Sequence, residues 1–155
     1  MTDSIDSKLA ARGITLPTPA APVAAYTPVV IAGGMAYLSG QLPFAKGGEV
    51  MTGRLGETAD VETGRRAAEA CGVMVLAQLK AALGSLDRVE RIVRLGVFVA
   101  STDDFTQQPK VADGASQLML EIFGDAGRHA RSAVGVPVLP LGAMVEIDAV
   151  VAIRD

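Results

Sequence analysis

The sequence is short of the residues that build redox, metal and nucleic-acid sites. It holds one cysteine, one histidine and no tryptophan in 155 residues, and aromatic residues make up 4%. Because Cys71 has no second cysteine to pair with, a disulfide within the chain is excluded, and one histidine with one cysteine cannot form a zinc cluster. The basic residues are scattered, the net charge is −3 and the pI is near 5.1. We therefore expect neither a metal nor a nucleic-acid partner.

Long apolar runs and phosphate loops are also missing. The most apolar stretch is interrupted by Pro137 and Pro140, so it is too short for a membrane helix. The opening residues MTDSIDSKLAARG contain acidic side chains and lack the apolar segment of a secretory signal. Gly47, Gly48 and Gly53 lack the lysine and the following helix of a phosphate-binding loop. We expect a cytoplasmic protein with no membrane partner.

What the chain does contain is enough apolar material for one well-packed domain. Hydrophobic residues make up 50% of it and the mean hydropathy is +0.36, which argues against disorder. A chain of this length fits a single domain, residues 1–155. Residues 1–25 form an extension, in which Ser4 to Arg12 is predicted to be a short helix ended by Gly13. Leu16 to Pro22 has three prolines and should be extended and irregular.

The rest of the chain alternates between strand and helix patterns in the order ββαβαββ. This order predicts an α+β fold, in which two helices cover one face of a mixed sheet. Gly33 and Gly34 supply the positive φ angles of a two-residue hairpin turn. The glycine-rich, charged segment 45–56 should be an exposed loop. We expect strands at 29–32 and 35–39, a helix at 60–83, a strand at 89–100, a helix at 106–123, and strands at 130–138 and 143–153.

The predicted core follows from the spacing of apolar residues in these elements. Residues at helical spacing in the two long helices, and at alternate positions in the strand between them, should face one another. The expected core residues are Ala68, Cys71, Val75, Leu79 and Ala82 in the first helix, Val93, Leu95, Val97 and Val99 in the strand, and Val111, Ala115, Leu118, Met119, Ile122 and Phe123 in the second helix.

Charged residues frame the most apolar part of the chain. Arg131 stands just before the uncharged run 133–145, and Glu146 and Asp148 follow it on one face of the predicted last strand. One interpretation is a solvent-exposed pair of charges. The other is that Arg131 and Glu146 meet across a hairpin in a cleft, where the guanidinium would bind a ligand carboxylate through two parallel hydrogen bonds and Glu146 would hold a water.

Three further residues have simpler interpretations. His129, the single histidine, is most simply a hydrogen-bonded residue in a polar turn. Cys71 is most simply a small core residue. Ser39 lacks an evident His/Asp pair to make it a nucleophile, so its hydroxyl is expected to satisfy a strand end.

The segments YLSGQLP (37–43) and RSAVGVPVLPLGAMVEIDAV (131–150) resemble the Rid family of YjgF-like reactive-intermediate deaminases. Some members of that family were first described as perchloric-acid-soluble ribonucleases. The early S-G-Q-x-P turn and the late R-S, L-P and V/I-E-I segments all occur here, and the resemblance covers the chain from Ala25 on. It implies a chorismate-mutase-like α+β fold and a homotrimer with clefts between neighbouring subunits.

The resemblance also implies an activity and a set of site residues. Such proteins hydrolyse 2-imino acids and their enamine tautomers to 2-keto acids and ammonia, with no cofactor. By residue-to-residue correspondence, Arg131 would bind the substrate carboxylate and Glu146 would position the attacking water. Tyr26 and Ser39 would line the cleft, and the backbone at Gly40 would help to orient the substrate.

Two positions depart from the family pattern. Ala133 stands where many deaminases have cysteine, although its backbone N–H can still bind substrate, and Pro109 stands where asparagine is common. Asp113 is a candidate to replace the lost contact. These departures keep open the alternative of a binding protein that holds small carboxylates without turning them over. A ribonuclease is a third alternative, against which the acidic pI, the few aromatic residues and the single histidine argue.

Overall fold

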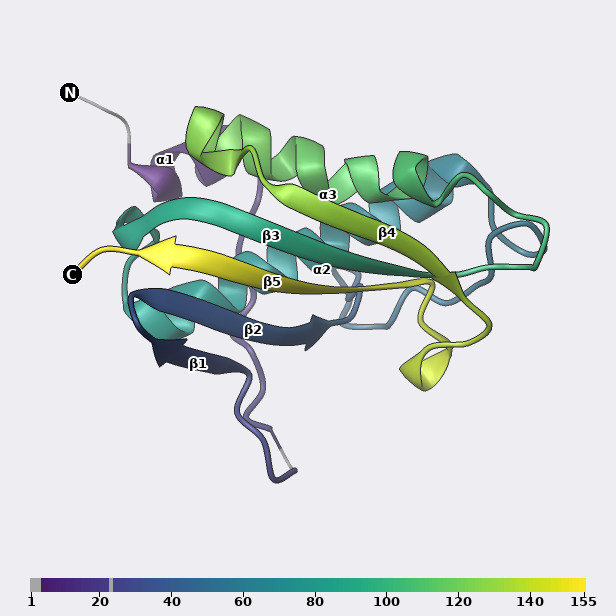
Figure 1. Cartoon of the computed structure of the whole chain (residues 1–155), viewed down its shortest axis with the longest axis horizontal. Coiled ribbons are helices and arrows are strands. Elements are labelled where there is room, and N and C mark those ends of the chain that lie inside the picture. Colours follow the sequence, from purple (N-terminus) through teal and green to yellow (C-terminus); the bar gives the residue numbers. More distant parts are fainter. Residues whose placement is uncertain (1–3, 23) are drawn as a thin grey trace.

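The computed structural model describes residues 4–22 and 24–155. Helices and strands follow one another in the predicted order after a short N-terminal helix (Figure 1). The elements are α1 (Ile5–Ala11), β1 (Val29–Ala32), β2 (Met35–Gln41), α2 (Val61–Leu83), β3 (Val89–Ala100), α3 (Gln108–Phe123), β4 (Ala130–Val136) and β5 (Val145–Ile153), with short 3-10 turns η1 (Leu86–Arg88), η2 (Gly124–Gly127) and η3 (Pro140–Gly142).

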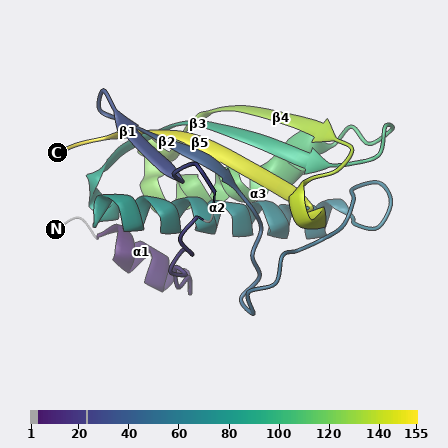
Figure 2. The same ribbon diagram turned by 90° about the horizontal axis from the view of Figure 1, so that it is seen from below.

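The five strands form one mixed sheet in the order β1-β2-β5-β3-β4. All neighbours are antiparallel except β3 and β4, which are joined through α3 and run parallel. The helices lie on one side of the sheet, and α1 lies on the side of the helix layer away from the strands (Figure 2). The α+β prediction is confirmed. One sheet face is therefore covered by helices and the other, the open face, is not.

Local sequence signals account for most element boundaries. Gly33 and Gly34 have φ angles of 59° and 76°, and Ala32 pairs with Met35 across them, as expected for the hairpin turn. The Asp60 side chain accepts a hydrogen bond from the Thr63 backbone N–H at 2.8 Å and so caps α2. That bond lowers the pKa of the Asp60 carboxyl. The predicted helix at 106–123 begins two residues late, at Gln108.

The helix layer packs closely because glycines stand where α2 and α3 meet. A Cβ on Gly114 of α3 would overlap the backbone carbonyl of Arg65 on α2. Gly64 and Gly72 of α2 lie against Val111 and Leu118 of α3. These contacts hold α3 at a fixed height over the sheet, which matters because α3 carries part of the site described below.

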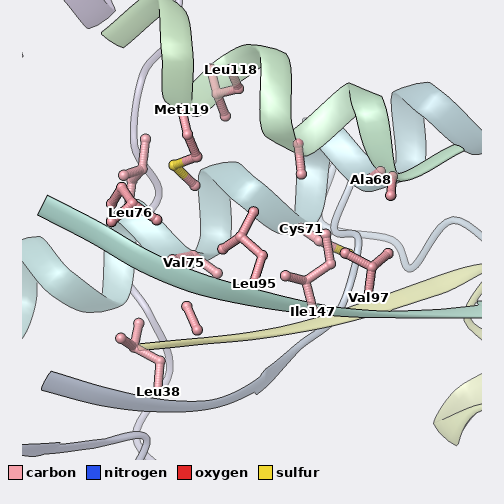
Figure 3. Packing of buried hydrophobic residues seen from close by; sticks show 14 of the residues in the cluster. Leu38, Ala68, Cys71, Val75, Leu76, Leu95, Val97, Leu118, Met119 and Ile147 are labelled. Atoms are coloured by element: carbon pink, nitrogen blue, oxygen red, sulfur yellow. The ribbon is translucent and has the colours of Figure 1, made fainter. Parts of the chain in front are cut away.

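The core lies between the sheet and the two long helices (Figure 3). Most predicted core residues are buried there, but three differ. A β-bulge between Ile92 and Arg94 shifts the register of β3, so Ile92 is fully buried in place of Val93. Ala82 is exposed on the outer side of α2, and Phe123 is half-buried. The segment 45–56 is also not wholly exposed, because Leu55 is completely buried.

Within the part of the chain that the structure describes, no helix has the length and apolar character needed to cross a membrane.

Candidate functional site

The Arg131 guanidinium is held at the edge of the sheet by α3. Its Nη1 donates to Asp113 Oδ1 at 2.8 Å and to Ser116 Oγ at 3.1 Å. The Arg131 side chain is only 23% exposed. Its Nε and Nη2 make no hydrogen bond with a residue in the described ranges, so one edge of the fork is left for a ligand. Such an edge fits a carboxylate, which guanidinium groups bind through two parallel hydrogen bonds.

The Glu146 carboxylate lies on the open face, above the middle of the sheet. Glu146 pairs with Phe98 of β3, while its neighbours Val145 and Ile147 are buried on the helix side. A Cβ on Gly40 of β2 would overlap the Glu146 carboxylate. The residue at position 40 must therefore be glycine for the carboxylate to lie there.

Glu146 has the character of a proton acceptor. It forms no hydrogen bond with any described residue, and it is only partly exposed. Burial raises the pKa of its carboxyl, and the nearby Asp148 carboxylate raises it further. A partly dehydrated carboxylate without a protein donor can accept a hydrogen bond from a water and take up its proton.

The Asp148 carboxylate lies beside Glu146 on the same face. A Cβ on Gly96 would overlap the Asp148 carboxylate, so Gly96 makes room for Asp148 as Gly40 does for Glu146. Arg94 Nη1 lies 3.5 Å from Asp148 Oδ1, and both side chains are well exposed. Arg94 therefore offsets part of the negative charge of this carboxylate pair.

The prediction that Arg131 and Glu146 meet across a hairpin is wrong. β3 lies between β4 and β5, so the last two strands are not neighbours. Arg131 pairs with Leu95, whose side chain is buried under the helices, whereas Glu146 points to the open face. The two groups are on opposite faces of the sheet within one chain. A site that uses both must take them from two copies of the chain.

The other predicted site residues divide between these two places. Ser39 and Gly40 belong with Glu146, at an irregularity in the pairing of β2 with β5. The Ser39 hydroxyl donates to the Pro28 carbonyl at 3.4 Å, in agreement with a hydroxyl that satisfies a strand end. Ala133 pairs with Val97 and lies on the same face as Arg131. Tyr26 is exposed in the segment before β1, and among the described residues its hydroxyl has no hydrogen-bond partner.

Sequence reasoning undervalued the residues on α3 that hold Arg131. Asp113 was considered only as a replacement for Pro109, and Ser116 was not considered. Pro109 lies exposed in the first turn of the helix, as predicted. The three-residue spacing of Asp113 and Ser116 places both on one helix face, and this was the signal available in the sequence.

The same fold, with a bulged β2 and a central acidic strand, occurs in a known family. The family model described as "YjgF/chorismate_mutase-like, putative endoribonuclease" matches residues 6–152. The chain belongs to the YjgF/chorismate mutase-like family. The resemblance seen in the motifs around Ser39 and Arg131 is thereby confirmed.

Two relatives in this family bracket the similarity. The protein TCP17 of Trypanosoma cruzi is 49% identical over 152 residues, which is 97% of this chain and 95% of the relative. A 2-iminobutanoate/2-iminopropanoate deaminase of Dermatophagoides farinae is 29% identical over 145 residues, which is 92% of this chain and 97% of the relative. The more similar of the two has a name that states no activity.

Solved structures of the family agree in fold. Atu1372 of Agrobacterium tumefaciens, a protein of unknown function, is 46% identical and superposes with a TM-score of 0.90, covering 97% of this chain and 94% of its own. TdcF of E. coli, crystallised with bound serine, is 27% identical with a TM-score of 0.62, covering 89% of this chain and 94% of its own. Family members therefore bind small molecules.

Proposed function

We propose that this protein is a cofactor-free hydrolase that converts reactive 2-imino acids and their enamine tautomers into 2-keto acids and ammonia. The observation that carries the proposal is the state of Arg131, which is fixed through Nη1 while its Nε and Nη2 edge stays open. An anchored guanidinium with a free edge is suited to a small carboxylate. The 29% identical deaminase supports the choice of substrate class.

The reaction needs little beyond binding and one proton acceptor. Arg131 binds the carboxylate of the imino acid, and Glu146 accepts a proton as water adds to the imine carbon. The proton then passes to the nitrogen of the resulting carbinolamine, the C–N bond breaks, and ammonia leaves as the C=O bond forms. Because the imine carbon is already electrophilic, orientation supplies most of the rate. The raised pKa of Glu146 makes its carboxylate a better base.

Because one chain holds Arg131 and Glu146 on opposite faces, the site is proposed to lie between neighbouring subunits of a homotrimer. One subunit provides Arg131, and the next provides Glu146 with Ser39 and Gly40. The open face supports such an assembly, because Val30, Tyr37 and Val134 are each nearly half exposed on it. Apolar side chains gathered on one face are typical of a subunit contact.

The direct test is hydrolysis of freshly generated 2-iminopropionate. Arg131→Ala should lower the rate at least about a hundredfold, since two charge-assisted hydrogen bonds are lost. Glu146→Gln should lower it by about a hundredfold or more. Arg94→Ala is the matched control, because it removes an arginine of the open face that the proposal does not use. Keto-acid release at the wild-type rate by the Arg131 variant would refute the assignment.

A second test asks whether the site is shared between subunits. Arg131→Ala chains co-expressed with Glu146→Gln chains form mixed trimers, in which one of the three seams receives both intact groups. Random mixing should then restore about a quarter of the wild-type rate. No recovery, with mixed trimers confirmed by native mass spectrometry, would exclude a site shared in this way.

The alternative is a protein that binds small carboxylates without turning them over. Asp113 favours it, because its carboxylate already occupies Nη1 of Arg131 and offsets the charge of the site. The serine bound to TdcF shows that a relative holds an amino acid. Calorimetry that shows binding of 2-oxobutanoate, in a protein without hydrolytic activity, would select this alternative.

A further inference from the structure

A chain of hydrogen bonds runs from the backbone of η2 to the Arg131 guanidinium. His129 Nδ1 lies 2.7 Å from the Gly127 carbonyl oxygen, and His129 Nε2 lies 2.8 Å from Ser116 Oγ. The same Ser116 oxygen accepts from Arg131 Nη1 at 3.1 Å. The single histidine of the chain is thus two hydrogen bonds away from the carboxylate-binding group.

The direction of each hydrogen bond follows from the chemistry of the groups. A carbonyl oxygen only accepts, so His129 Nδ1 must carry a proton and donate it to Gly127. In the neutral ring Nε2 is then an acceptor, and the Ser116 hydroxyl donates to it. This leaves the lone pairs of the Ser116 oxygen for Arg131, which can only donate. The four groups form one unidirectional series from Arg131 through Ser116 and His129 to Gly127.

The position of the Gly127 carbonyl is set by close packing. A Cβ on Gly127 would overlap the backbone carbonyl of Met119 on α3. Glycine at this position lets η2 lie directly against the helix, where its carbonyl reaches the imidazole. The start of the hydrogen-bond series is therefore attached to the backbone rather than to a mobile side chain.

The surroundings keep His129 in its neutral form. Burial lowers the pKa of the imidazole and the Arg131 charge adds to this effect, while the hydrogen bond to Gly127 opposes it. Asp113 is bound to Arg131 on the α3 side. On the other side, Asp125 pairs with Arg128, and Arg91 donates to the Arg128 carbonyl. Near neutral pH the Nε2 lone pair is available to Ser116.

We propose that His129 is a positioning residue for the Arg131 carboxylate site. Its Nε2 lone pair orients the Ser116 hydroxyl, and Ser116 and Asp113 then hold Arg131 Nη1 so that Nε and Nη2 face the ligand. The proposal rests on the proposed function for the identity of the ligand. It gives His129 no part in proton transfer to substrate, because Ser116 and Arg131 stand between them.

Two substitutions separate this role from a merely structural one. His129→Gln places an amide oxygen near the position of Nε2 and so keeps an acceptor for Ser116. His129→Asn keeps a donor for the Gly127 carbonyl but loses that acceptor. His129→Asn and Ser116→Ala should raise KM for the imino acid about three- to tenfold and leave kcat within about twofold, as expected for one lost hydrogen bond. His129→Gln should stay close to the wild type.

Equal KM values in the Asn and Gln variants, or a loss confined to kcat, would overturn the proposal. Competition by 2-oxobutanoate gives the same comparison as a binding constant, so the test also applies to a protein that binds without catalysis. If Arg131→Ala leaves both turnover and binding unchanged, the proposed function fails.

Nitrogen NMR tests the hydrogen-bond series in the unliganded protein, whatever the activity. With one histidine in the chain the imidazole signals need no assignment by mutation. At neutral pH we expect a proton on Nδ1 and none on Nε2. The Arg131 Nε signal, assigned by its loss in Arg131→Lys, should move in His129→Asn and not in His129→Gln. The opposite tautomer, or an Arg131 signal that ignores both variants, would overturn the inference.

Discussion

The two faces of this sheet are made by the same strands but have different demands. On β5, Val145, Ile147 and Ala149 face the helices and are almost completely buried, whereas Glu146 and Asp148 face the open side. The helix face is filled by apolar side chains that pack on α2 and α3. The open face instead holds two carboxylates, and glycines in the neighbouring strands make space for them. One face stabilises the fold, and the other places chemical groups.

Arg131 belongs to neither pattern completely. It lies on the helix face, but β4 is the edge strand, so the arginine reaches past the core to the margin of α3. There its charge is met by Asp113 and Ser116 instead of by apolar side chains. The comparison teaches that an edge position lets a charged group be anchored by the helix layer and still remain open to ligand.

The sharpest way to break the comparison is to mutate adjacent residues of β5. Ile147→Ala should lower the free energy of unfolding by about 2–5 kcal/mol, because it leaves a cavity at a fully buried position. Glu146→Gln should leave it unchanged or higher at pH 7. The raised pKa of Glu146 means that the folded protein holds the ionised carboxylate less favourably than the unfolded chain does. Urea unfolding of both variants measures the difference, and equal losses would contradict it.

Most of the fold follows from local patterns in the sequence. The hairpin turn at Gly33 and Gly34, the Asp60 cap and the helical spacing of α2 are each readable within a few residues. The bulge in β3 was not readable, because Ile92 and Val93 are both β-branched and either could fill the core. Local patterns therefore predict elements better than they predict register.

The candidate site was predicted residue by residue but not in its arrangement. The alternation along β5 correctly placed Glu146 and Asp148 on one face. The error was to treat β4 and β5 as a hairpin, although the β3–α3–β4 order favours a parallel crossover, which would have put β4 beside β3. Which strand then pairs on the other side of β3 depends on contacts between distant segments, and no short motif reports them.

A smaller effect, on activity instead of stability, tests how the open face places Glu146. Gly40→Ala puts a methyl group where the Glu146 carboxylate lies, so the carboxylate must move, and hydrolysis should fall about tenfold. Gly47→Ala is the matched control, because a Cβ there also meets a carboxylate, that of Glu49, in an exposed loop where it can swing away. Equal rates in the two variants would show that the position of Glu146 does not matter.

The smallest expected effect concerns the pair of carboxylates. Glu146 must be ionised to accept a proton, so activity should fall as the pH is lowered through its raised pKa, at a higher pH than for an ordinary glutamate. Asp148→Asn removes the neighbouring negative charge, which lowers the pKa of Glu146 and moves this acid limb to lower pH. Part of the displacement should remain, because burial is the larger cause. Asp103→Asn, an exposed aspartate outside the sheet, is the control. A pH–rate profile of kcat/KM that stays in place in Asp148→Asn, or moves to higher pH, would mean that the acid limb does not report Glu146.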